Sequence, residues 1–194
     1  MFSGLLGTTH VALPPARRFH PPRRPSPPVD PTTAAYLVLK SIHVIAASLF
    51  LGYWVFAAYW KVSTDRARDL RVIAATSDRL LRADRAFVLP TALVLFVTGY
   101  VIVRPLGYYG GAIAEAPFAL YGLFILFGIV ALWYFAVKPV GVKLADIADG
   151  AVASDAREPT PEYIASSATW LLLVALIVLA TLVSAILMVW RPGS

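Results

Sequence analysis

Four long apolar segments alternate with polar segments along the chain. Their approximate bounds are residues 34–60, 86–103, 117–138 and 163–190. Each is long enough to cross a bilayer as a helix, which takes roughly 17–25 residues. The pattern predicts an all-α fold: an integral membrane four-helix bundle over residues 34–192, preceded by an extended N-terminal tail.

Prolines and arginines dominate the tail, residues 1–33, so it can neither form a stable helix nor build a core. It is predicted to be extended and polyproline-like. Two interpretations stay open. The tail is either a disordered segment or an arm that docks on a neighbouring protein.

The composition excludes a soluble protein. Hydrophobic residues make up 59% of the chain and charged residues 14%, whereas a soluble domain carries about 25% charged residues. The basic residues behind the net charge of +6 lie mainly in the tail and a connector that flank apolar segments, where Lys and Arg meet lipid headgroups. We therefore expect lipid headgroups as partners and no nucleic acid. The absence of cysteine excludes disulfides, iron–sulfur clusters and covalent c-type haem.

The connector after the first apolar segment, residues 61–85, is predicted to be an amphipathic helix or a helical hairpin at the headgroup level. Its apolar residues recur at roughly helical spacing, and they are Leu70, Ile73, Leu80 and Leu81. Asp78 and Arg82 are spaced to form an i, i+4 ion pair. The later connector should be part helix and part loop. Thr160, Pro161 and Glu162 have the residue types that start a helix.

Four spans place both ends of the chain on one side of the membrane. The two connectors on the other side carry nine basic residues: Lys61, Arg66, Arg68, Arg71, Arg79, Arg82, Arg85, Lys143 and Arg157. The termini and the short middle loop carry six: Arg17, Arg18, Arg23, Arg24, Arg104 and Arg191. Because basic loops tend to stay inside, we predict a multi-pass protein of a bacterial cytoplasmic membrane. Its connectors would lie in the cytoplasm and its termini on the periplasmic side.

Lys40 and His43 are the two strongly polar residues within the first apolar segment. They are three residues apart and therefore share a helix face. An ionisable residue at membrane depth is a functional-site candidate. His43 could ligate haem iron through a neutral imidazole nitrogen, or it could hydrogen-bond to a neighbouring helix. Lys40 could reach the headgroups.

The other apolar segments contain no histidine, so one chain cannot supply two histidine ligands to a haem within its spans. Small and hydroxyl residues indicate helix contacts, and the candidates are Ser48, Gly52, Thr91, Thr98 and Gly99. Every acidic residue falls in the tail, in a connector or just before a span. The sequence therefore predicts no buried carboxylate of the kind that proton pumps use.

Residues 36–44, YLVLKSIHV, together with Arg82-Ala83-Asp84, Leu89-Pro90 and Thr98-Gly99, carry a family resemblance. In these motifs the chain resembles a bacterial family of predicted integral membrane proteins of unknown function. That family is distantly similar to HemJ-type protoporphyrinogen oxidases and CopD-type membrane proteins. The resemblance implies a four-helix bundle with a b-type haem at His43. In this chain the third apolar segment stays apolar until Lys138, where the HemJ-type pattern has further polar residues.

Three functional hypotheses follow. The first is a non-enzymatic accessory subunit of a larger respiratory or photosynthetic membrane complex, docked on other membrane subunits through its tail and helix faces. The alternative is a haem b-binding membrane oxidoreductase of the HemJ-like kind, with His43 as ligand and Lys40 as a nearby proton or anion contact. A small transporter is a third hypothesis, for which no polar pathway is visible in the sequence.

Overall fold

The computed structural model describes residues 34–103 and 117–190. Within them, four helices are long and apolar enough to cross a membrane: Ala34–Ala67, Leu70–Val103, Phe118–Ala153 and Pro161–Trp190. The predicted all-α membrane bundle is therefore confirmed. The predicted tail, residues 1–33, lies outside the described residues.

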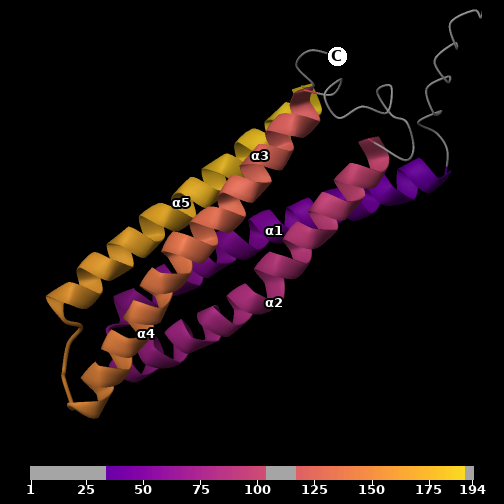
Figure 1. Ribbon diagram of the computed structural model, residues 1–194. Coiled ribbons are helices and arrows are strands. Elements are labelled where there is room, and N and C mark those ends of the chain that lie inside the picture. Colours follow the sequence, from indigo (N-terminus) through magenta and orange to yellow (C-terminus); the bar gives the residue numbers. More distant parts are fainter. Residues whose placement is uncertain (1–33, 104–116, 191–194) are drawn as a thin grey trace, which may run out of the picture.

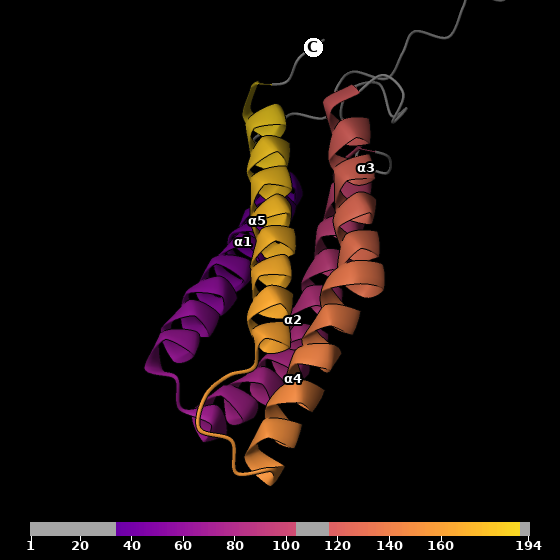
Figure 2. The same ribbon diagram turned by 90° about the vertical axis from the view of Figure 1, so that its left-hand side faces the viewer.

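The elements in chain order are α1 (Ala34–Ala67), α2 (Leu70–Val103), α3 (Pro117–Leu132), the π-helical turn η3 (Trp133–Val137), α4 (Lys138–Ala153) and α5 (Pro161–Trp190). α1 and α2 form one antiparallel pair. The continuous α3–η3–α4 helix forms another pair with α5 (Figures 1 and 2). α1 begins and α5 ends at the same end of the bundle. We call the opposite end, with the α1–α2 turn and the α4–α5 loop, the connector end.

The first connector is a helical hairpin made by the ends of α1 and α2. α1 does not stop at the end of the apolar segment but continues to Ala67, and α2 begins at Leu70. Each helix has 34 residues, which at about 1.5 Å per residue is about 51 Å. The hydrocarbon core is about 30 Å thick, so part of each helix extends past it. The predicted Asp78–Arg82 ion pair is confirmed at 2.7 Å.

A two-residue turn joins α1 to α2. Arg68 has a φ of 55°, the left-handed conformation in which helices commonly end. Asp69 then caps α2, because its Oδ1 accepts hydrogen bonds from the backbone N–H groups of Arg71 at 3.0 Å and Val72 at 3.3 Å. The start of α5 has the predicted cap, since the Thr160 hydroxyl accepts from the backbone N–H of Tyr163 at 3.1 Å.

Two prolines lie inside membrane helices, and each is accommodated differently. Pro90 lies in α2, which bends along its length (Figure 1). Pro139 follows the π-helical turn, in which the Lys138 N–H donates to the Trp133 carbonyl five residues back. A proline removes one hydrogen bond and crowds the carbonyl four residues earlier. The wider turn accommodates both the lost bond and the crowding. The third helix therefore runs past the predicted segment to Ala153.

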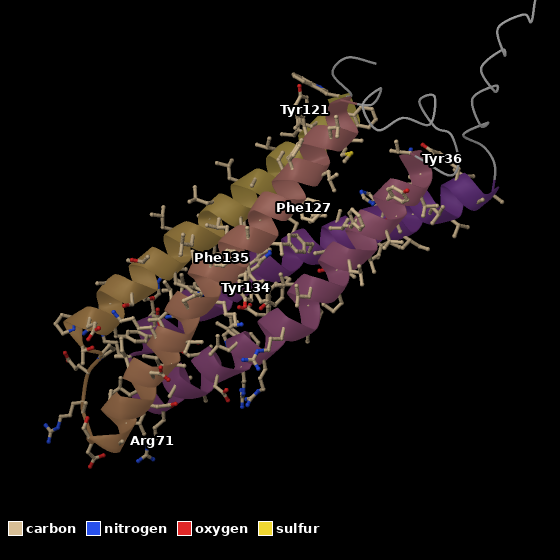
Figure 3. All side chains as sticks on the ribbon, viewed as in Figure 1. Tyr36, Arg71, Tyr121, Phe127, Tyr134 and Phe135 are labelled. Carbon is tan, nitrogen blue, oxygen red and sulfur yellow. The ribbon has the colours of Figure 1, made fainter. Side chains whose placement is uncertain are left out.

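Each helix buries one stripe of residues in the bundle. On α1 this stripe comprises Tyr36, Ala46, Phe50, Trp54, Ala57, Lys61 and Thr64. From Ala46 onward the residues follow in steps of three and four, which suits one helix face. The outward faces are apolar and rich in aromatic residues. Tyr121, Phe127, Tyr134 and Phe135 are all exposed along α3 and η3 (Figure 3). Nitrogen and oxygen atoms gather toward the connector end, where Arg71 lies (Figure 3).

The turn generates a stability prediction. Arg68→Gly should raise the free energy of unfolding by about 0.5–1 kcal/mol, because glycine adopts a positive φ without the steric cost of a Cβ. The measurement is unfolding of the detergent-solubilised protein followed by tryptophan fluorescence. Arg66→Gly is the matched control, since Arg66 lies in the last helical turn of α1 and glycine there should lower stability. Equal losses in both variants would contradict the assigned turn.

Candidate functional site

Polar side chains lie at three levels inside the bundle, and His43 marks the level farthest from the connector end. His43 Nδ1 lies 2.8 Å from Thr98 Oγ1 across the α1–α2 interface. Thr98 Oγ1 also lies 2.6 Å from the Val94 carbonyl oxygen, which can only accept a hydrogen bond. The single hydroxyl proton therefore goes to Val94, and the Nδ1–H of His43 donates to Thr98. This tautomer leaves the lone pair on Nε2.

Gly99 makes room for the His43 ring. A Cβ on residue 99 would lie 3.3 Å from His43 Cε1, closer than most side-chain contacts. A glycine here lets the imidazole approach α2 closely enough to meet Thr98. Of the predicted helix-contact residues, Thr98 and Gly99 are the two that the structure brings to His43.

The remaining predicted residues lie elsewhere. Lys40 is exposed, and its ammonium lies over the Tyr36 ring, 5.6 Å from the ring centroid. The Ser48 hydroxyl donates to the Val44 carbonyl at 2.9 Å within α1. Gly52 is exposed, and the Thr91 hydroxyl donates to the carbonyl of Phe87 in its own helix.

The middle level is centred on Asp84, which corrects the prediction of no buried carboxylate. Asp84 is 3% exposed in α2. The Tyr53 hydroxyl from α1 donates to its Oδ1, and the Trp133 indole from η3 donates to its Oδ2 at 3.3 Å. One carboxylate thus ties three elements together. Hydropathy does not reveal it, because Asp84 lies within a run of connector charges.

The level nearest the connector end is centred on Lys61, which is 2% exposed. Its ammonium donates to Asp65 at 2.5 Å, to the Tyr163 hydroxyl at 2.8 Å and to the Ser167 hydroxyl at 3.0 Å. The same two hydroxyls donate to the Asp65 carboxylate, at 2.7 Å from Tyr163 and 2.6 Å from Ser167. All three ammonium protons are used, as a buried charge requires. This cluster joins α1 to α5.

A small cavity lies between the Lys61 and Asp84 levels. Its volume is about 10 Å³, close to the space that one water needs. Lys61, Ser77 and Asp84 contribute to its lining. The Ser77 hydroxyl is buried and makes no hydrogen bond within the described part of the chain. The rest of the lining is mainly apolar, and the cavity is too small for an organic substrate.

At the Asp84 and Lys61 levels, the charged groups are fully engaged in hydrogen bonds within the bundle. Each buried charge is held by donors or acceptors from neighbouring helices, which suits holding helices in register. The His43 level differs, because Nε2 of its imidazole keeps a lone pair. Among the residues that the structure describes, no group of three or more His, Cys, Asp or Glu side chains could hold a metal ion.

Comparison with known proteins gives one match. The profile of a family described as "Predicted integral membrane protein (DUF2269)" matches residues 37–192. No curated protein and no solved structure matches the chain. The more distant resemblance to HemJ-type and CopD-type proteins stays a prediction.

The Asp84 level generates a second prediction. Asp84→Ala should lower the free energy of unfolding by about 2–4 kcal/mol, because each donor left buried without an acceptor costs about 1–3 kcal/mol. Asp84→Asn keeps one carbonyl acceptor and should lose less. Chemical unfolding in detergent measures both.

Asp78→Ala is the control for this series. It removes an acidic residue six positions away whose ion pair with Arg82 is exposed on both sides, so its effect should stay below about 1 kcal/mol. A similar loss for Asp78→Ala and Asp84→Ala would contradict the assigned role of Asp84.

Proposed function

Since this chain belongs to the DUF2269 family of predicted integral membrane proteins, we propose that it works within the membrane as a non-enzymatic accessory subunit of a larger complex. The interior supports this proposal. The charged groups of Lys61 and Asp84 are bound by their own bundle, and the cavity between them has room for about one water. We expect the outer faces of the helices to carry the function.

One surface feature carries the proposal. Exposed residues follow each other along α3 and η3 in alternating steps of three and four, and they are Tyr121, Phe124, Gly128, Ala131 and Phe135. This is the spacing with which one helix packs along another. We call these five residues the α3 seam.

The chemistry of the α3 seam suits another membrane helix. A Cβ on Gly128 would have no heavy atom within 4 Å, so a partner backbone could approach closely there. Aromatic residues on either side are typical of the cores of protein interfaces. We propose that the α3 seam binds another membrane subunit of the complex. The docking role of the tail stays a prediction, since residues 1–33 lie outside the described part of the chain.

We also propose an orientation in a bacterial cytoplasmic membrane. Basic residues of both connectors belong to the connector half of the bundle: Arg71 lies at the connector end (Figure 3), and Lys143 pairs with Glu162 at the start of α5 at 2.8 Å. Under the positive-inside rule this end faces the cytoplasm. The start of α1 and the end of α5 then face the periplasm.

A second candidate function is favoured by the His43 tautomer. The hydrogen bond from Nδ1 to Thr98 orients the imidazole and leaves Nε2 with a lone pair that can bind a metal. Histidines that hold a metal have the same arrangement. His43 would hold haem b through Nε2, and the haem iron would supply redox chemistry. The described residues offer no second histidine, and His43 lines neither of the two described cavities.

The subunit proposal predicts the behaviour of a seam variant. Gly128→Leu should reduce recovery of the tagged full-length chain in a higher-mass complex about tenfold, the factor that a loss of about 1.4 kcal/mol produces. The measurement is native electrophoresis after mild solubilisation of the native membrane. Gly52→Leu is the matched control, because Gly52 is also exposed with no heavy atom within 4 Å of its Cβ position. A wild-type chain that runs alone, or equal losses in both variants, would overturn the proposal.

The haem candidate predicts a spectrum. The purified chain should show a Soret band that is lost in His43→Ala. Thr98→Val, which keeps the shape of the side chain, should weaken or shift the band because Nδ1 loses its acceptor. A colourless wild-type chain purified from haem-replete cells would count against this candidate and leave the subunit proposal untouched.

A further inference from the structure

A groove runs along the outside of the α1–α2 pair. Its volume is about 440 Å³. Gly52, Phe56 and Trp60 from α1 and Arg79 and Phe87 from α2 contribute to its lining. The space beside residue 52 is open, because a Cβ there would meet no heavy atom within 4 Å. α1 and α2 lie side by side along this stretch (Figure 1).

The groove has the dimensions of a lipid chain. Its lining on α1 extends from Ser48 to Trp60, twelve residue steps that at about 1.5 Å each span about 18 Å. One leaflet of the hydrocarbon core is about 15 Å thick, half of about 30 Å. The side chains along it are mainly apolar and aromatic. A single acyl chain therefore matches the groove in length and polarity.

Charge is present at only one end of the groove. Among the described residues that line it, Arg79 is the single charged one. It lies toward the connector end, and Trp60 is the α1 lining residue closest to that end. Tryptophan is typical of the headgroup level. Tyr53 adds no polar group to the groove wall, because its hydroxyl donates inward to Asp84 and its ring stacks on Phe87 with centroids 5.5 Å apart.

Arg79 is available to an external anion. Its side chain is exposed, and it forms none of the ion pairs found within the described part of the chain. Arg82, one turn further along α2, is already paired with Asp78. A guanidinium at the headgroup level is suited to bind a phosphate through two parallel hydrogen bonds.

We propose that the α1–α2 groove binds an anionic phospholipid, with one acyl chain along Gly52 and Phe56 and the phosphate on Arg79. The observation that carries this is an acyl-length apolar groove with a cation at its headgroup end that forms no ion pair within the described residues. The site does not depend on the subunit proposal, because it uses a different face from the α3 seam.

The test is native mass spectrometry of the full-length protein with added phosphatidylglycerol or phosphatidylcholine of the same acyl chains. Phosphatidylglycerol should bind more tightly. Arg79→Gln should weaken its binding roughly fivefold, the effect of one basic residue near an anionic headgroup. Arg82→Gln removes the same charge from the same helix and should leave binding unchanged. Equal effects of the two variants, or equal binding of both lipids to the wild-type chain, would overturn the proposal.

A second pair of variants tests the acyl-chain contact. Gly52→Leu fills the groove and should abolish retention of phosphatidylglycerol, whereas Gly128→Leu fills open space on α3 and should leave it unchanged. Circular dichroism should report the same helix content for both, since neither new side chain meets an atom within 4 Å of its Cβ. If Gly52→Leu instead converts a dimer to a monomer and lipid binding persists, the groove is an interface between two copies and the lipid proposal fails.

Discussion

A charged side chain inside a helix bundle must find its partners there, and this constraint decides how the four helices fit together. Apolar contacts alone give little guidance within a membrane, because lipid chains are as apolar as the helix faces. Lys61 binds α1 to α5, and Asp84 binds α2 to α1 and η3. Breaking a buried pair by removing one partner costs about 3–5 kcal/mol. The polar levels therefore set the rotation of each helix, while hydropathy decides only that it is a membrane helix.

The spans, the bundle and the family could be predicted because they depend on properties averaged over many residues. Four apolar segments remain apolar whichever residue occupies any one position. The His43 contact with Thr98 and Gly99 was only partly visible, since His43 stands alone among apolar residues and its partners are ordinary helix-packing residues. Nothing in the sequence indicates that Thr98 would orient the imidazole.

Lys61 and Asp84 could not be found from hydropathy, because Lys61 begins and Asp84 lies within a run of charges that looks solvated. Helical phase is the signal that could have revealed them. Lys61 lies seven residues after Trp54, and Asp84 lies midway between Leu80 and Val88, so each continues a buried stripe. Tracing the stripes past the ends of the apolar segments would have placed both charges inside the bundle.

The π-helical turn has a consequence for the rotational phase of the third helix. Buried residues Ile129, Trp133, Val137 and Gly141 follow one another in steps of four, and in a regular α-helix each such step would drift by about 40° around the axis. The wider turn at Trp133–Val137 removes that drift, so α3 and α4 act as two segments with independently set faces. If the same residues wound as a regular α-helix, the one residue that the π-turn adds would advance the helix by about 100° and swing every later side chain of α4 by that angle. The α4 face that now packs in the bundle would then point outward, although the composition and hydropathy of the helix would hardly change.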